Sequence, residues 1–188
     1  MNPKSLALLT GLALAAGFSS AASAADPAAE RTEIRQMCDG ALKTLYKAKP
    51  KLKSVIAKAP GYACFSSFGV TLVVGGAGGK GLVHDHASGK DTYMRMAQAS
   101  AGVELGIKDY REVVVFHNAE AMHKFVESGW EATAGGGASA AADGSGGTAE
   151  KGGTFTDSMT FYPMTKTGLS AGGSLGGRKY WKDKDLNQ

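Results

Sequence analysis

The sequence predicts an α+β protein in which N-terminal helices precede a mostly antiparallel, strongly curved or barrel-like β-sheet with one further short helix. Helical periodicity is confined to residues 30–59 and to a short stretch after Asn118. Most of the remaining chain alternates β-branched and aromatic residues with glycine, and such segregation of helices from strands is typical of α+β folds. The 27 glycines among 188 residues favour a sheet that bends sharply.

Two helices are expected at the start of the folded part. From Glu30 onwards, apolar residues recur at helical spacing and form one stripe, which consists of Ile34, Met37, Cys38, Ala41, Leu42, Leu45 and Tyr46. Pro50 interrupts this pattern and can open a second helix. The apolar face of that second helix consists of Leu52, Val55, Ile56 and Ala59. Pro60 and Gly61 then end it.

Strands are expected after Gly61, where β-branched and aromatic residues take over. The pattern places them near residues 63–68, 71–75, 81–86, 92–97, 100–107 and 112–117. Asn118 caps a short helix that Gly129 stops. A final pair of strands is expected at 154–164 and 168–173, and residues 179–188 read as a charged tail with Tyr180 and Trp181 as candidate anchors.

Residues 1–24 are predicted to be a secretory signal peptide. Lys4 supplies a positive n-region, an apolar run covers residues 6–18, and Ala22-Ser23-Ala24 is an A-x-A cleavage pattern. The alternative is a membrane anchor, but a run of about 13 residues is shorter than the roughly 20 that a span needs. Cleavage leaves residues 25–188 as a single domain, with a periplasmic or secreted location.

Export into an oxidising compartment makes a Cys38–Cys64 disulfide the natural interpretation of the two cysteines. It would connect the first helix to the first strand. The alternative is two buried free thiols, because cysteine packs like a small hydrophobic residue.

Two glycine motifs imitate catalytic signatures. Residues 76–81 satisfy G-x-G-x-x-G, but the chain continues as a strand where a dinucleotide site needs a helix. Residues 168–172 satisfy G-x-S-x-G, but the glycine-rich segment that follows is a poor helix and His123 is the last histidine of the chain. Neither motif therefore supports an enzyme.

Metal, cofactor and nucleic-acid binding are not predicted either. His84 and His86 lie on one face of a strand and could form half of a metal site, but they more simply read as polar residues that run into a turn. The net charge of +4 is compatible with an anionic partner without requiring a nucleic acid.

The order of several short segments resembles the SYLF domain family, a lipid-binding domain that is also described as actin-binding in yeast proteins. The segments that carry the resemblance are 59–65, 75–83, 101–106, 113–116 with 121–125, and 168–177. The similarity covers roughly residues 30–181. It implies binding rather than catalysis, with lipid as the expected ligand of bacterial exported members. Because this chain has an export signal, actin is not an expected partner.

The resemblance and the charge pattern together suggest a lipid site. We expect a non-enzymatic periplasmic protein that binds anionic phospholipid or a membrane surface, the alternative being an envelope structural or protein-interaction module without lipid affinity. Lysines flank the second helix's stripe at about 90° from its centre, where their ammonium groups can reach a phosphate layer. The candidate lipid-binding residues are Lys43, Lys47, Lys49, Lys51, Lys53 and Lys58.

Overall fold

The computed structural model describes residues 26–67, 71–72, 76–99, 110–132, 154–155, 158–165, 168–169 and 177–188. Its helices are α1 (Pro27–Ala48), α2 (Leu52–Lys58) and α3 (Ala119–Ser128). Its strands are β1 (Gly61–Ser66), β2 (Thr71–Leu72), β3 (Gly76–Asp85), β4 (Lys90–Ala99), β5 (Arg111–Phe116), β6 (Trp130–Ala132), β7 (Thr154–Phe155), β8 (Met159–Thr165), β9 (Gly168–Leu169) and β10 (Arg178–Lys182).

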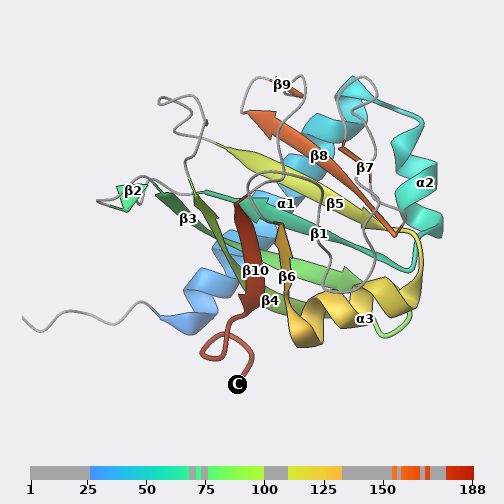
Figure 1. Ribbon diagram of the computed structural model, residues 1–188. Helices are drawn as coiled ribbons and strands as arrows, with labels where there is room; N and C mark the ends of the chain where they lie inside the picture. Colours follow the sequence, from blue (N-terminus) through green and yellow to red (C-terminus); the bar gives the residue numbers. More distant parts are fainter. Residues whose placement is uncertain are drawn as a thin grey trace, which may run out of the picture.

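All described strands belong to one antiparallel sheet, in the order β6-β10-β4-β3-β1-β5-β8-β7, with β2 beside β3 and β9 beside β8. The sheet is strongly curled: α1 and α2 cover its outer face, whereas α3 lies against the inner face (Figure 1). The predicted α+β class, with N-terminal helices, a curved sheet and a later short helix, is confirmed.

The first helix forms because its N-terminus is capped and one face is apolar. The Asp26 carboxylate accepts a hydrogen bond from the Ala28 amide at 3.0 Å, and Pro27 occupies the first turn, where no amide donor is needed. The helix therefore starts at Pro27 rather than at Glu30. The predicted stripe is buried against the sheet, with Tyr46 only partly covered.

Two apolar cores lie on opposite faces of the sheet. The outer core joins α1 and α2 to side chains of β1, β3, β4, β5 and β8. The inner core is rich in aromatic and methionine side chains, among them Phe65, Phe116, Phe125, Trp130 and Tyr180. Phe65 of β1 contacts Tyr180 of β10 with ring centroids 4.7 Å apart, although β3 and β4 separate these strands in the sheet. The inner core therefore spans the curl.

A buried ion pair also crosses the inner face. Glu112 of β5 and Arg178 of β10 are 0% and 2% exposed, and Arg178 Nη1 donates to Glu112 Oε2 at 2.8 Å. Tyr110 donates to the same oxygen at 2.5 Å, and Tyr180 donates to Oε1. Burial, reinforced by the neighbouring Glu112, raises the pKa of both tyrosines well above 10.0. We call these four residues the inner polar cluster.

The structure departs from the sequence prediction at three places, and one of them is the single strand expected at 154–164, which is instead the antiparallel pair β7 and β8. The segment read as the start of a charged tail forms β10, which pairs with both β4 and β6. The three-residue strand β6 was not predicted. The strand expected at 100–107 lies outside the described residues, as do 73–75 and 170–173 of two other predicted strands.

Candidate functional site

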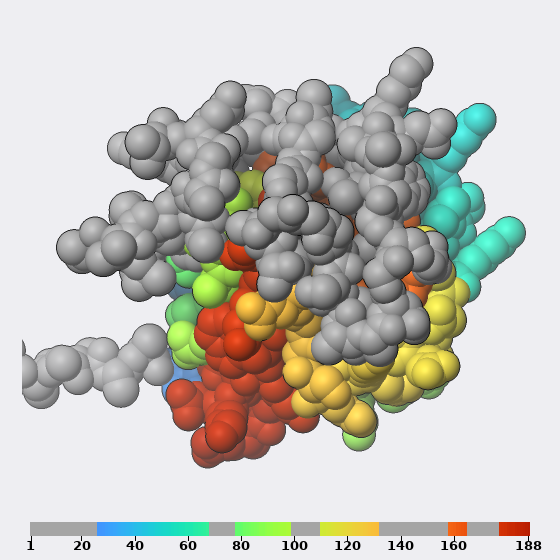
Figure 2. Space-filling model, viewed as in Figure 1, coloured from blue at the N-terminus to red at the C-terminus, as the bar shows by residue number. Residues whose placement is uncertain are grey.

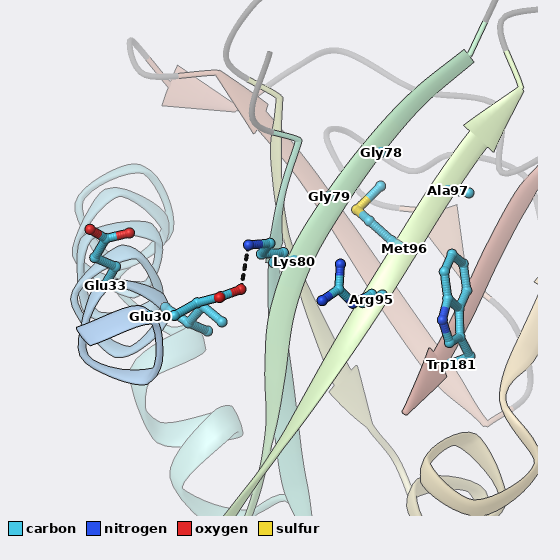
Figure 3. Close-up of a pocket in the computed structure, with 10 residues that line it drawn as sticks. Glu30, Glu33, Gly78, Gly79, Lys80, Arg95, Met96, Ala97 and Trp181 are labelled. Atoms are coloured by element: carbon cyan, nitrogen blue, oxygen red, sulfur yellow. Dashed lines mark ion pairs between the residues drawn. The ribbon is translucent and has the colours of Figure 1, made fainter. Parts of the chain in front are cut away.

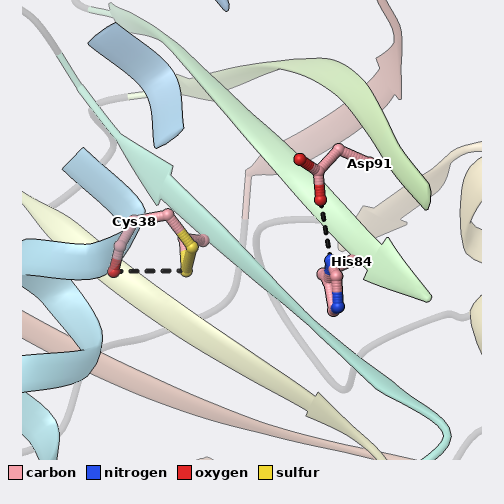
Figure 4. Close-up of a disulfide and its surroundings, with 4 residues drawn as sticks. Cys38, His84 and Asp91 are labelled. Atoms are coloured by element: carbon pink, nitrogen blue, oxygen red, sulfur yellow. Dashed lines mark hydrogen bonds and ion pairs between the residues drawn. A yellow bond between two sulfur atoms is a disulfide. The ribbon is translucent and has the colours of Figure 1, made fainter. Parts of the chain in front are cut away.

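A disulfide fixes the helical layer to the sheet. Cys38 of α1 and Cys64 of β1 are bonded, with Cα atoms 5.2 Å apart, and both residues are buried in the outer core (Figure 4). The predicted bridge is therefore confirmed. It anchors the middle of α1, so that the C-terminal half of this helix and the connection to α2 take a defined position over β1, β5 and β8.

Polar contacts hold the N-terminal half of α1. Arg31 donates through Nε to the Leu186 carbonyl at 2.9 Å and through Nη2 to the Gln188 carbonyl at 3.1 Å. Arg35 Nε pairs with Asp91 Oδ2 at 3.0 Å. The N-terminal half of α1 is thus fastened to the C-terminal segment and to β4.

The lysines predicted to bind lipid lie along the end of α1, the α1–α2 connection and α2. Lys43, Lys47, Lys51, Lys53 and Lys58 are exposed. Lys49 is half-buried, with its Nζ 5.5 Å from the centre of the Tyr162 ring. Figure 2 shows α2 at the margin of the molecule, with long side chains that extend away from the body. We call these six residues the lysine surface.

The apolar stripe of α2 divides between the core and the solvent. Ile56 is 2% exposed, and Leu52 and Ala59 pack against the outer core. Val55, by contrast, is 49% exposed. Lys51 and Lys58 are its i−4 and i+3 neighbours, so they lie beside Val55 on the outward side of the helix. The solvent side of α2 therefore presents one valine between two lysines.

In the described part of the chain, five of the six residues of the lysine surface form no ion pair, and the sequence around α2 contains no acidic residue. No acidic residue occurs in the sequence between Asp39 and Asp85. Within the described ranges, no ion pair forms at Lys43, Lys47, Lys51, Lys53 or Lys58. Elsewhere Lys80 pairs with Glu30 and Lys179 with Glu131. This surface is therefore a concentrated positive patch.

The motifs that imitate catalytic sites have structural roles where they are described. Residues 76–81 belong to β3 and pair with β4 in continuous register, without a helix. Residues 168–169 form β9, and 170–172 lie outside the described residues. His84 Nδ1 bonds Asp91 Oδ1 at 2.8 Å, and His86 Nδ1 bonds the Ala59 carbonyl at 2.7 Å. The described residues contain no group of three or more side chains that could hold a metal ion.

Sequence reasoning missed a cavity of about 460 Å³ on the outer face. It lies between the first turns of α1 and the ends of β3, β4 and β10 (Figure 3). The residues that line it are Glu30, Glu33, Ile34, Gly78, Gly79, Lys80, Arg95, Met96, Ala97 and Trp181. The exposed Trp181 and the small residues at 78, 79 and 97 were the available signals, but only the strand register brings them together.

None of the helices in the described ranges is long and apolar enough to cross a membrane.

Comparison with known proteins adds the family. Residues 97–188 match the family model described as "Ysc84: Las17-binding protein actin regulator". The chain is 35% identical over 158 residues to Beta cell expansion factor A of Aeromonas veronii; the alignment covers 84% of this chain and 59% of that relative, so this chain spans about three-fifths of the relative's length. Together with the ordered motifs and the curled sheet, these matches confirm the resemblance to the SYLF (Ysc84) domain family, whose model matches residues 97–188.

Proposed function

We propose that this protein is an exported, periplasmic and non-enzymatic lipid-binding protein that associates with anionic membrane surfaces through the lysine surface. The observation that carries the proposal is the group of six lysines on the end of α1, the α1–α2 connection and α2, five of them exposed and free of ion pairs in the described ranges. The resemblance to a family of binding domains supports binding rather than catalysis.

The geometry of α2 favours peripheral contact over deep insertion. Leu52, Ile56 and Ala59 are engaged in the outer core, so the apolar stripe is not free to enter a bilayer. Val55 alone among the stripe residues is exposed. Attraction therefore comes mainly from the ammonium groups, each of which contributes at most about 1 kcal/mol near an anionic surface. Binding should weaken as salt rises, because ions screen exposed charges.

Lipid is preferred to actin as the ligand because of the predicted export signal. The family description names Las17 binding and actin regulation. A chain that carries a signal peptide at residues 1–24 leaves the cytoplasm. The family's binding role is then directed at the envelope, where anionic phospholipid is the abundant negatively charged surface.

Vesicle flotation tests the proposal. The mature protein should float with vesicles that contain phosphatidylglycerol and stay behind with vesicles of phosphatidylcholine alone. The triple variant Lys51→Gln, Lys53→Gln, Lys58→Gln should reduce binding to the anionic vesicles several-fold, within the ceiling that about 1 kcal/mol per lysine sets.

A matched control removes the same total charge elsewhere. Lys90, Lys124 and Lys182 are exposed and lie outside the lysine surface. Changing these three to glutamine should leave flotation close to that of the unmodified protein. Equal losses in both triple variants, or binding that does not respond to salt, would contradict the lysine surface as the site. A protein that never floats would instead favour an envelope interaction module.

A further inference from the structure

The cavity on the outer face is formed by one cross-strand row of long side chains and one row of small residues. In the register, Lys80 of β3 lies opposite Arg95 of β4, which in turn lies opposite Trp181 of β10. The neighbouring row on the same face brings Gly78 opposite Ala97. The cavity occupies the space above these small residues, between α1 and Trp181 (Figure 3).

The floor and walls are apolar and open to a ligand. A Cβ atom built on Gly78 would meet no other atom within 4 Å. Trp181 is 38% exposed, one of two large apolar side chains so exposed in the described ranges. Ile34 of α1 contributes the opposite wall. A volume of about 460 Å³ falls within the usual range for sites that bind small molecules.

The charged side chains that line the cavity are two acids, Glu30 and Glu33, and two bases, Lys80 and Arg95, of which Arg95 has hydrogen-bond donors to spare. Arg95 is held through Nε by the buried Asp183 carboxylate at 2.7 Å, while its side chain stays 40% exposed. Its two terminal nitrogens make no hydrogen bond to any described residue, and a guanidinium fixed in this way can donate both to one carboxylate or phosphate. Lys80 pairs with Glu30, whereas Glu33 points away from Lys80 and Arg95 (Figure 3).

We propose that this cavity binds a single-chain anionic amphiphile. Its carboxylate or phosphate head accepts hydrogen bonds from Arg95, and its hydrocarbon chain lies over Gly78 and Ala97 against the Trp181 ring. The proposal does not depend on membrane association. Glu30 and Lys47 are roughly 25 Å apart along α1 at the usual helical rise, so the cavity and the lysine surface are separate.

Calorimetric titration of the mature protein with three soluble amphiphiles of equal chain length, each below its micelle-forming concentration, tests the head group. Dodecanoate and dodecyl phosphate should bind, and comparison of the two identifies the preferred anion. Dodecyltrimethylammonium, with the same chain and a cationic head, should bind at least about tenfold more weakly because it cannot accept hydrogen bonds from Arg95. Equal binding of the cationic and anionic compounds would overturn the assignment.

Two variants test the location. Gly78→Leu fills the floor without a backbone clash and should reduce dodecanoate affinity about tenfold or more, because the added side chain occupies the chain's position. Trp181→Ala removes an exposed wall and should also weaken binding, even if Gly78→Leu proves unstable. The matched control Lys124→Leu adds the same side chain to the exposed surface of α3 and should bind normally.

Unchanged affinity in both cavity variants would overturn the site. The variant with Lys51, Lys53 and Lys58 changed to glutamine shows whether a ligand binds in the cavity or at the lysine surface, so the cavity proposal and the proposed function can fail independently. Soluble dodecanoate should bind that variant as it binds the unmodified protein. If the lysine variant loses dodecanoate while Gly78→Leu keeps it, the ligand binds at the lysine surface and the cavity proposal falls.

Discussion

Glu112 shows how one residue can join distant strands. Its carboxylate is fully buried on β5 and accepts hydrogen bonds from Tyr110, Arg178 and Tyr180. Burial alone would lower the pKa of Arg178, but the charge of Glu112 beside it raises that pKa above its usual range. A pair so buried is sensitive to loss of one partner, because the other is left charged without compensation.

Glu112→Gln is therefore expected to lower the free energy of unfolding by about 3 kcal/mol or more. Urea denaturation of the mature protein measures the loss. Glu131→Gln is the matched control, since Glu131 pairs with Lys179 at 3.3 Å where both side chains are more than half exposed. That change should cost less than about 1 kcal/mol. Similar losses in both variants would contradict a special contribution from the inner polar cluster.

Tyr62 should make stability fall at alkaline pH. Burial, and then the charge of Asp91, raises its pKa from 10.0 to about 12. Between these values the unfolded chain releases the phenol proton while the folded protein keeps it, so the unfolded state binds fewer protons and stability decreases as pH rises. The Tyr62→Phe variant should show a shallower decline over this interval in urea midpoints. Parallel curves for the two proteins would contradict the shifted pKa.

At the scale of elements, the Cys38–Cys64 bridge connects α1 to β1 and should stabilise the folded protein. The bridge closes a loop with a sequence separation of 26. In the chain-entropy treatment a loop of this size contributes about 3 kcal/mol. The double variant Cys38→Ala, Cys64→Ala should lose about that much stability in urea denaturation. Thiol labelling of the unreduced, unfolded native sequence should find no free cysteine; two labelled thiols would contradict the bridge.

Gly129 ends α3 with φ at 73°, and a Cβ there would lie 2.5 Å from the Tyr180 carbonyl oxygen. Gly129→Ala therefore combines left-handed strain with a backbone clash and should cost about 3 kcal/mol. Gly89 is the matched control: its φ is 66°, but a Cβ would meet nothing within 4 Å. Gly89→Ala should cost about 1 kcal/mol. Equal unfolding midpoints for the two variants would show that α3 can move away from β10.

Elements with strong periodicity were predictable from the sequence, whereas those defined by pairing were not. The stripe of α1 and the run that forms β5 follow directly from spacing and side-chain type. β10 coincides with the start of the charged tail predicted at 179–188, where charged residues are frequent and where Arg178, just before it, is charged as well. Its burial depends on Glu112, which lies 66 residues earlier in the chain. Local patterns carry no information about such a partner.

At the scale of the molecule, the candidate sites show the same limit. Helical spacing predicts that the lysines flank the stripe of α2. It does not predict that Val55 is exposed while Ile56 is buried, because that depends on how α2 packs on the sheet. The cavity depends on the registers β3–β4 and β4–β10, which align Gly78 with Ala97 and Arg95 with Trp181. Neither register is encoded in a short segment.

Export also concerns the whole chain, and the intact mass of the protein shows whether the signal peptide has been removed. The mature N-terminus is expected at Ala25, because Ala22 and Ala24 are the small residues that the cleavage pattern requires. Protein recovered from the cell envelope should therefore lack residues 1–24. Retention of those residues would contradict the periplasmic proposal. The protein would then not be expected in an oxidising compartment, where a disulfide forms readily.

The position of β10 has a consequence for synthesis. The strand lies between β4 and β6 although it is the last of the described strands along the chain, and the carbonyls of Leu186 and Gln188 accept hydrogen bonds from Arg31 near the beginning of the described chain. A nascent polypeptide that has not yet reached Arg178 therefore leaves the edge of β4 unpaired, an open template for other chains. Closure of the sheet must wait until β10 has been made, and a stop codon before Arg178 should yield an aggregating product, because the edge of β4 then stays unpaired.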